Sequence, residues 1–334
     1  MITLRTRLIN LLKNDEDGAI IVIVAMSMTI ILVFAAFVLD LGLAYVKTAE
    51  IQNTADAASL AAGQLLPVDA DDEGSITAVK NAAILYAGKN GVADLLAQEV
   101  TLEDLVNGKY TSVRVNIPCV VALSFAKVVG IDTITISRSA KTSITPTTQI
   151  SGAAPLAVEM SQLSSAIANN NTEHIYLKYG AGDGTEGSYG AIDLDGVQGG
   201  GASDFSNWLQ FGYNGIIKIG EDLLPVEKGN MSGPTASAVT QRYNACTHFQ
   251  DEGGCTAEHY DPSCPRMLKI LVVEKVGSTN VKVKGFAVFV LEGEADTNGE
   301  VLGSYIKSLE PGNITQDTNW GTTEFGVYNL GLSG

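Results

Sequence analysis

The hydrophobic pattern of the chain is dominated by one stretch near its amino terminus. From Ala19 to Leu39 the sequence runs for 21 residues without a charge, and its only polar side chains are Ser27 and Thr29. A helix of about 20 apolar residues spans the roughly 30 Å hydrocarbon core of a bilayer, and it satisfies its own backbone hydrogen bonds there. We therefore expect residues 18–66 to form a transmembrane helix that continues outside the bilayer as a stalk.

The charges that flank the apolar stretch predict its orientation. Arg5, Arg7 and Lys13 precede it, whereas the next basic residue after it is Lys47. Positive residues near the end of a span stay in the cytoplasm. Residues 1–17 are therefore expected to be cytoplasmic, and everything beyond the span to be extracytoplasmic, as in a single-pass protein of the cell membrane.

A secretory signal peptide also has a basic start and an apolar core. That core is usually 7–15 residues long and ends at a small-residue cleavage site with a polar boundary. Here the apolar stretch is longer, and Ala35 and Ala36 lie inside it. The sequence therefore favours an uncleaved anchor.

The outer half of the predicted helix, residues 40–66, is rich in alanine, and small residues allow another helix to approach closely. Gln52, Asn53 and Asp56 form a polar patch within little more than one turn. Polar groups on a packed helix need partners, so the patch is a candidate for contact with a neighbouring helix. The alternative is that these side chains face water.

The next segment alternates between helical and strand periodicity. Apolar residues at helical spacing predict a helix over residues 75–90, followed by a strand at 111–118, a short helix within 119–130 and an alternating strand at 132–144. We expect residues 67–145 to form a small α+β unit.

Residues 145–152 are polar, contain Pro146 and predict a linker. In the remaining domain, residues 146–334, a possible helix ends near Ala168, glycines gather between 180 and 233, and apolar alternation marks several strand-like runs. These runs cover residues 174–180, 266–276, 280–294 and 300–309. A mostly antiparallel sheet is expected, which makes the whole chain an α+β protein with a β-rich carboxy-terminal domain.

Charge excludes some functions. The 334 residues carry a net charge of -16, and binding to nucleic acid or to an anionic membrane surface requires clustered lysine and arginine. Nucleic acid is therefore not an expected partner.

A cysteine- and histidine-rich segment is the densest group of reactive side chains. It contains Cys246, His248, Cys255, His259 and Cys264 within 19 residues. An extracytoplasmic location favours a disulfide among the three cysteines, although spacing does not select the pair. Zinc bound by these thiols and imidazoles and free thiols are the alternatives, and Cys119 is a distant fourth thiol.

Two acidic, glycine-containing loops offer oxygen ligands that suit calcium. These ligands are Asp193, Asp195, Asp296, Asn298 and Glu300. Neither loop has the spacing of an EF-hand, and Asp-x-Asn-Gly between two strands is first of all a hairpin turn.

Catalytic motifs are missing from the sequence. It contains no Gly-x-Ser-x-Gly elbow, no phosphate-binding Gly-x-x-x-x-Gly-Lys and no His-Glu-x-x-His. We therefore expect no enzymatic activity and no cofactor.

The amino-terminal segment resembles the corresponding module of TadG-like (TadE/TadG-type) proteins, which are pilin-like membrane proteins of the Flp, or tight adherence, pilus machinery. The resemblance rests on an ordered set of residues around the apolar stretch. They are Gly18, Asp40-Leu41-Gly42, Tyr45, Gln52, Asn53, Asp56-Ala57-Ala58 and Leu60-Ala61-Ala62. It implies a non-enzymatic, single-pass protein that serves pilus assembly and contacts other pilus subunits through its helix.

The chain departs from that family in two respects. Processed pilins of this system have a glutamate five residues after the cleavage-site glycine, whereas the fifth residue after Gly18 is Ile23. Larger TadG proteins often carry a von Willebrand A domain with an Asp-x-Ser-x-Ser metal motif, which the chain lacks. We expect an unprocessed anchor without that domain. The alternative function is an anchored cell-surface adhesin whose carboxy-terminal domain binds a surface ligand.

Overall fold

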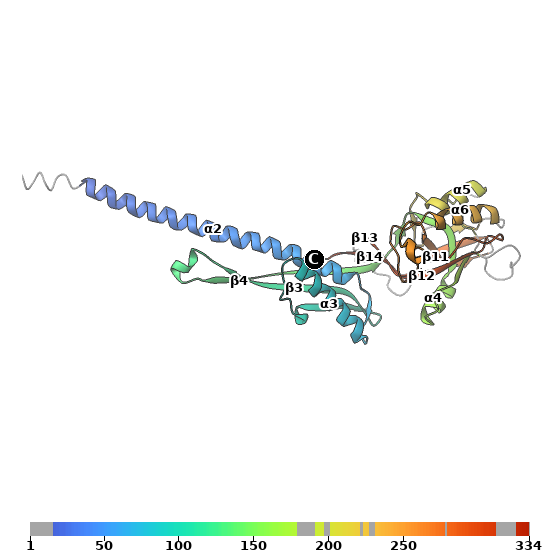
Figure 1. The fold of residues 1–334 in the computed structure, drawn as a ribbon, viewed down its shortest axis with the longest axis horizontal. Helices are drawn as coiled ribbons and strands as arrows, with labels where there is room; N and C mark the ends of the chain where they lie inside the picture. Colours follow the sequence, from blue (N-terminus) through green and yellow to red (C-terminus); the bar gives the residue numbers. More distant parts are fainter. Residues whose placement is uncertain are drawn as a thin grey trace, which may run out of the picture.

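The fold is described here from a computed structural model for residues 16–178, 191–196, 201–220, 223–226, 231–277, 279–311 and 325–333. Figure 1 shows a long helix that projects from one folded unit, with a second unit at the opposite end. We call the first the membrane-proximal unit (residues 51–146, 308–311 and 327–332) and the second the distal unit (the described residues between 149 and 306). Helices and sheets mix throughout both units, which confirms the predicted α+β class.

Helix α2 (Glu16–Gly63) is continuous from the apolar stretch into the membrane-proximal unit. At 1.5 Å per residue its 48 residues extend for about 72 Å. The apolar side chains from Ile20 to Leu43 are exposed on every side, and this is the one helix of the described residues that is long and apolar enough to cross a membrane. The long apolar helix predicted from the sequence is confirmed, and it ends at Gly63.

The last turns of α2 are buried because alanines allow close packing there. Ile51, Ala55, Ala58 and Ala62 belong to the core of the membrane-proximal unit. Helix α3 (Glu73–Lys89) packs on them and contributes Val79, Ala83 and Ala87, which are four residues apart and share one face. The Asp72 carboxylate caps α3 by accepting a 3.1 Å hydrogen bond from the Ser75 backbone N–H.

The other side of this core is a six-stranded sheet with the order β1-β3-β4-β14-β13, in which β2 also pairs with β3. Its strands come from both ends of the chain. They are β1 (Val68–Asp69), β2 (Val100–Val106), β3 (Lys109–Ala122), β4 (Thr133–Pro146), β13 (Ser308–Pro311) and β14 (Val327–Leu332). The short 3-10 helix η1 (Ala97–Glu99) leads into β2.

Two sequence predictions are corrected in this unit. The expected short helix within 119–130 is strand as far as Ala122, and only Ala126–Val129 form a 3-10 helix, η2. The β-branched residues Val120 and Val121 fit a strand better than a helix. The predicted boundary at 145/146 assigned β13 and β14 to the second domain. They belong to the first sheet instead, because β14 pairs with the free edge of β4 and β13 pairs with β14.

The distal unit is built on a second six-stranded sheet with the order β6-β10-β11-β12-β7, and β9 also pairs with β11. Most of its pairs are antiparallel, as expected, and β6 pairs with β10 in parallel. The strands are β6 (Ala153–Glu159), β7 (Ile175–Lys178), β9 (Leu223–Pro225), β10 (Met267–Val276), β11 (Asn280–Leu291) and β12 (Val301–Ile306).

Both faces of this sheet are covered. Along β10, Leu271 and Val273 enter one hydrophobic cluster, while Ile270 and Val272 enter another on the opposite face, as the two-residue period of a strand requires. The second cluster also includes residues of the three helices. These helices are α4 (Met160–Ala168), α5 (Gly201–Phe211) and α6 (Ser232–Asn244).

Half of the predicted linker at residues 145–152 is strand. β4 continues to Pro146, and β5 (Gln149–Ile150) pairs with β8 (Ile217–Lys218). The Lys307 ammonium group also bridges the two units by donating a 3.3 Å hydrogen bond to the Leu65 carbonyl. Burial lowers the pKa of Lys307 to about 8, and a cavity of about 1070 Å³ lies beside it between the units.

Candidate functional site

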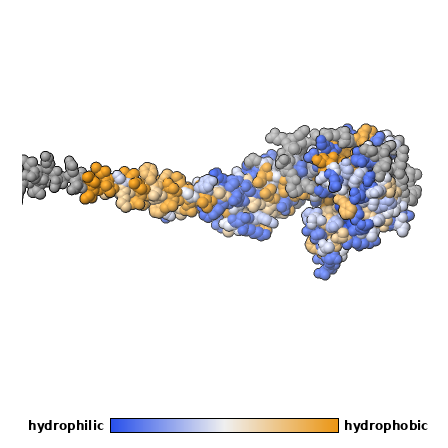
Figure 2. Space-filling view, turned by 90° about the horizontal axis from the view of Figure 1, so that it is seen from above, coloured by the Kyte–Doolittle hydropathy of each residue, from blue (hydrophilic) through white to orange (hydrophobic). Residues whose placement is uncertain are grey.

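The amino-terminal half of α2 exposes a continuous apolar surface. Figure 2 shows a hydrophobic surface along the projecting helix, which gives way to hydrophilic surface at the membrane-proximal unit. Ile20, Ile31 and Leu39 are 56%, 65% and 61% exposed. Apolar surface of this extent on all sides of a helix suits hydrocarbon and not water.

Asp40, the first residue after the apolar stretch, joins the helix to a distant loop. Its buried carboxylate accepts hydrogen bonds from the backbone N–H groups of Ser124, Phe125 and Ala126, at 2.9, 3.0 and 2.7 Å. These N–H groups begin η2 at the tip of the β3–β4 hairpin, where an acidic side chain compensates unpaired donors. The carboxylate therefore fixes the tip of the hairpin against α2.

The tip of the hairpin also exposes apolar side chains. Phe125, Val128 and Ile131 are 45%, 89% and 50% exposed. Figure 1 shows the hairpin running beside α2 towards the amino-terminal half of the helix. No local sequence pattern predicts this surface, because the contact joins residues 84 to 86 positions apart.

The polar patch predicted on the stalk is divided between two environments. The Gln52 amide donates to the Asp56 carboxylate at 2.9 Å and to the Ser139 carbonyl of β4 at 3.4 Å. Asn53 is exposed. Within this chain, Gln52 thus contacts a strand and Asp56 contacts Gln52, and contact of the patch with a neighbouring helix stays a proposal.

Small residues on the buried side of the stalk are used for packing within the chain. The Thr142 hydroxyl of β4 donates a 2.9 Å hydrogen bond to the Ser59 hydroxyl. Gly63 lies where a Cβ atom would come within 2.5 Å of Thr142 Cγ2. The alanine-rich outer half of α2 therefore accommodates the chain's own sheet.

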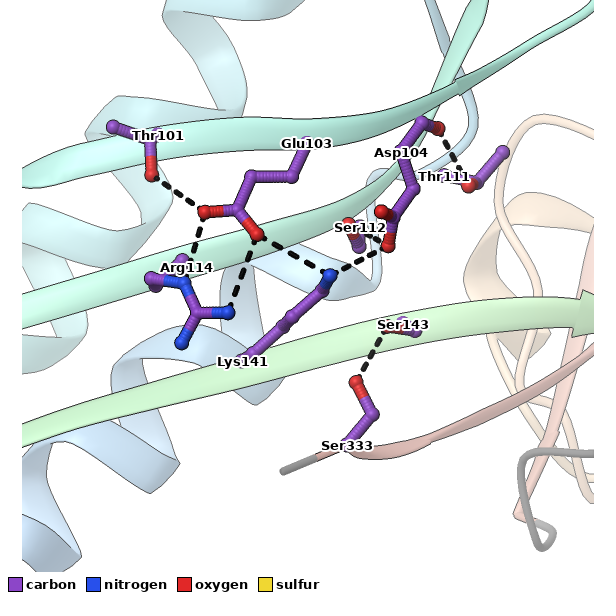
Figure 3. Close-up of polar contacts among 9 residues, drawn as sticks. All are labelled: Thr101, Glu103, Asp104, Thr111, Ser112, Arg114, Lys141, Ser143 and Ser333. Carbon is purple, nitrogen blue, oxygen red and sulfur yellow. Dashed lines mark hydrogen bonds and ion pairs between the residues drawn. The ribbon is translucent and has the colours of Figure 1, made fainter. Parts of the chain in front are cut away.

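Charged side chains cross-link three strands of the membrane-proximal sheet (Figure 3). Lys141 of β4 lies 2.6 Å from the Asp104 carboxylate and 3.2 Å from the Glu103 carboxylate of β2. Arg114 of β3 donates to both oxygens of Glu103, at 2.8 and 3.3 Å. The sequence analysis did not identify this cluster, because no local pattern reveals which strands pair.

The hydrogen bonds within this charged cluster shift its pKa values. The bond from Arg114 lowers the pKa of Glu103, and the bond from Lys141 lowers that of Asp104. Burial alone would lower the pKa of Lys141, but hydrogen bonds to Asp104 and Glu103 raise it. Each shift favours the charged form of its group.

The structure assembles four donors of the cysteine–histidine segment. The sulfur atoms of Cys246, Cys255 and Cys264 and a ring nitrogen of His248 all lie within 4.8 Å of one another. The three cysteines are buried, and their thiols are free. Burial raises the pKa of Cys264 to about 12, whereas at Cys246 burial is outweighed by hydrogen bonds from the Cys255 backbone and the Cys264 thiol, which lower its pKa to about 6.

The other members of the predicted set lie elsewhere. His259 stacks on Phe249 at 3.8 Å between ring centroids, and its Nδ1 atom is 2.8 Å from the Glu252 carboxylate. It is therefore not among the four donors. Cys119 lies on β3, in the membrane-proximal unit, where it packs against that unit's core.

The loop proposed for calcium forms a turn of its own. The Asp296 carboxylate accepts hydrogen bonds from the backbone N–H groups of Asn298 and Glu300, at 3.0 and 2.7 Å. Asp193 is buried and Asp195 is exposed in a separate loop. These hydrogen bonds explain the turn at residues 296–300 without a metal ion. Calcium binding by the predicted residues of the two loops is supported only by the chemistry of their oxygen ligands.

These features define a class: an α+β protein with a long amino-terminal helix that is apolar enough to span a membrane and leads into the folded units. Comparison with known families gives the next step. Residues 18–65 match the Tad family model, described as putative Flp pilus-assembly TadE/G-like, and these are nearly the bounds of α2. The chain is TadE/TadG-like in this segment, as the resemblance predicted. No curated protein and no solved structure matches the chain.

Proposed function

We propose that this chain is a single-pass, pilin-like membrane protein that takes part in the assembly or structure of a Flp-type pilus. The observation that carries the proposal is that the Tad family match at residues 18–65 falls on the one described helix that can span a membrane. The role is non-enzymatic, since a helix of this kind acts by binding lipid and other helices.

The proposed topology places the amino terminus in the cytoplasm and both units outside. Arg5, Arg7 and Lys13 support this orientation. Protease added to intact cells with a permeable outer envelope should remove the distal unit and leave α2 in the membrane. Full protection of the distal unit from the protease would contradict this topology and place the unit in the cytoplasm.

Deletion of the protein in its native host tests the function. Loss of pili in electron micrographs, with recovery by the wild-type chain, is the expected result. A chain whose residues 19–39 are replaced by an unrelated apolar span of equal length should stay in the membrane without restoring pili. Normal pili with lost attachment would instead identify an anchored adhesin that binds its ligand through the distal unit.

A further inference from the structure

We propose that Cys246, His248, Cys255 and Cys264 form a structural zinc site in the distal unit. Three thiolates and one imidazole are a common ligand set for structural zinc. In a tetrahedral site with Zn–S bonds of about 2.3 Å, neighbouring sulfurs lie about 3.8 Å apart. The four donors already lie within 4.8 Å of one another, so small side-chain rotations complete the tetrahedron.

The histidine provides an independent argument for a metal. The Nδ1 atom of His248 is buried and has no hydrogen-bond partner among the described residues. A buried polar atom without a partner is costly. Its other ring nitrogen, Nε2, lies 3.9 Å from the Asp261 carboxylate. This distance is too long for a hydrogen bond, but it places a carboxylate beside the nitrogen that a second-shell partner of a zinc-binding imidazole would contact.

The surroundings of the sulfurs also suit thiolates. The backbone N–H group of Asp261 donates to the Cys255 sulfur, and that of Arg266 donates to the Cys264 sulfur, each at 3.4 Å. The Arg266 guanidinium group donates to the Cys255 carbonyl at 3.2 Å. Three thiolates and Zn²⁺ carry a net charge of about -1, and a neighbouring arginine compensates it.

A disulfide accounts for fewer of these observations. A bond between any two sulfurs, about 2.05 Å long, would leave the third thiol unused and the His248 Nδ1 atom buried without a partner. The extracytoplasmic location favours disulfides in general, but it does not explain why an imidazole faces the three sulfurs. Zinc engages all four groups at once.

Metal analysis of the full chain, purified from membranes of the native host, tests the site. We expect one zinc per chain by mass spectrometry, and thiolate-to-metal charge-transfer absorption after exchange with Co²⁺. His248→Ala should lose the metal, while the matched variant His259→Ala should retain it. Chelation should lower the thermal midpoint of the wild-type chain.

Two outcomes would overturn the zinc site. One is a bridged peptide joining two of the three cysteines in a non-reducing digest of metal-free protein. The other is failure of the wild-type chain to bind zinc after equilibration with excess Zn²⁺ under reducing conditions. Both use the unmodified chain, so neither depends on whether a cysteine variant folds.

A separate observation carries a second inference: we propose that the tip of the β3–β4 hairpin inserts into the outer surface of the bilayer. This inference rests on the proposed membrane span. The hydrogen bonds of Asp40 fix the tip at the residue where the apolar stretch of α2 ends. The height of the tip relative to the bilayer is therefore set by the anchor.

The side chains at the tip suit a lipid surface. Phe125 and Val128 are exposed, and Lys127 lies between them in sequence. Apolar side chains with a neighbouring cation are typical of segments that lie at the boundary between headgroups and acyl chains. Because the net charge of the chain is -16, we attribute the contact to apolar insertion and not to general electrostatic attraction.

Tryptophan fluorescence in proteoliposomes tests this contact. Val128→Trp should emit at shorter wavelength than Leu223→Trp, an exposed control in the distal unit, and brominated phospholipids should quench only the former above the wild-type background. Equal quenching of the two variants would overturn the insertion. A protease-protected α2 in the same vesicles shows that the span is intact, so failure of the tip is distinguishable from failure of the anchor.

Discussion

At the scale of single residues, the stalk depends on side chains that are small. Gly63 ends α2 against Thr142, whose side chain is fully buried and hydrogen-bonded to Ser59. A β-branched threonine in this position has little freedom to turn away. The alanines and glycine of the TadE/G-like segment thus have a packing role in this chain, besides any role in contacts with other subunits.

Gly63→Ala should destabilise the membrane-proximal unit. The added Cβ would lie 2.5 Å from Thr142 Cγ2 and 3.0 Å from Leu330 Cδ1, and overpacking of this kind costs roughly 1–3 kcal/mol. Urea unfolding of the full chain in detergent measures the loss. Gly88→Ala is the matched control, because nothing lies within 4 Å of its added Cβ; it should leave stability unchanged or raise it by up to about 1 kcal/mol. Equal effects would contradict the packing argument.

At the scale of elements, helices and strands set by local sequence patterns could be predicted, whereas contacts between residues far apart in sequence could not. The periodicity of α2 and α3 and the apolar runs of β10 and β11 are local, and the structure places these elements as predicted. The partners of Asp40 and the pairing of β14 with β4 depend on contacts more than 80 residues apart. Cys246, His248, Cys255 and Cys264 were all identified as candidates from the sequence. Their convergence, and the position of His259 outside the group, depend on the turns that connect them, which the spacing does not reveal.

The charged cluster between β2, β3 and β4 should make stability depend on acid pH. Because Glu103 and Asp104 have pKa values lowered from 4.5 and 3.8 in the folded chain, their contribution is present above about pH 4.5 and is lost as the pH falls through the folded values. Lys141→Met should therefore reduce the free energy of unfolding by roughly 1 kcal/mol at neutral pH, and the difference from wild type should shrink near pH 3.

Urea unfolding of the full chain in detergent, repeated across this pH range, measures the difference. Lys275→Met, at an exposed position of β10, provides the comparison and should show little effect at either end of the range. A difference for Lys141→Met that stays constant down to pH 3 would show that the ion pairs do not contribute.

At the scale of the whole molecule, strands from the carboxy-terminal part of the chain complete the sheet of the membrane-proximal unit. β14 follows the distal unit in sequence and pairs with β4 from Tyr328↔Pro146 to Leu332↔Thr142. Tyr328 is buried in the core that α2 and α3 complete. Together with the bond from Lys307 to Leu65, this strand connects the distal unit to the end of the anchor helix.

Tyr328→Ala should therefore destabilise the membrane-proximal unit, although the residue lies far from that unit in sequence. Truncation of a buried aromatic side chain costs about 3–5 kcal/mol, and hydrogen exchange of α3 and β4 should rise accordingly. Phe211→Ala is the control, because Phe211 is 70% exposed; it should change stability by no more than about 0.5 kcal/mol. Unchanged exchange in β4 would contradict the shared core.

The position of β14 in the sequence also has a consequence for the order of folding. The Thr147 hydroxyl donates a hydrogen bond to Asn329, which is 182 residues later in the chain, so this edge of β4 stays open until the whole distal unit has been translated. Open strand edges invite pairing with other chains and attack by proteases. A chain that lacks β14 therefore leaves this edge of β4 unpaired, even when all of its distal unit is present.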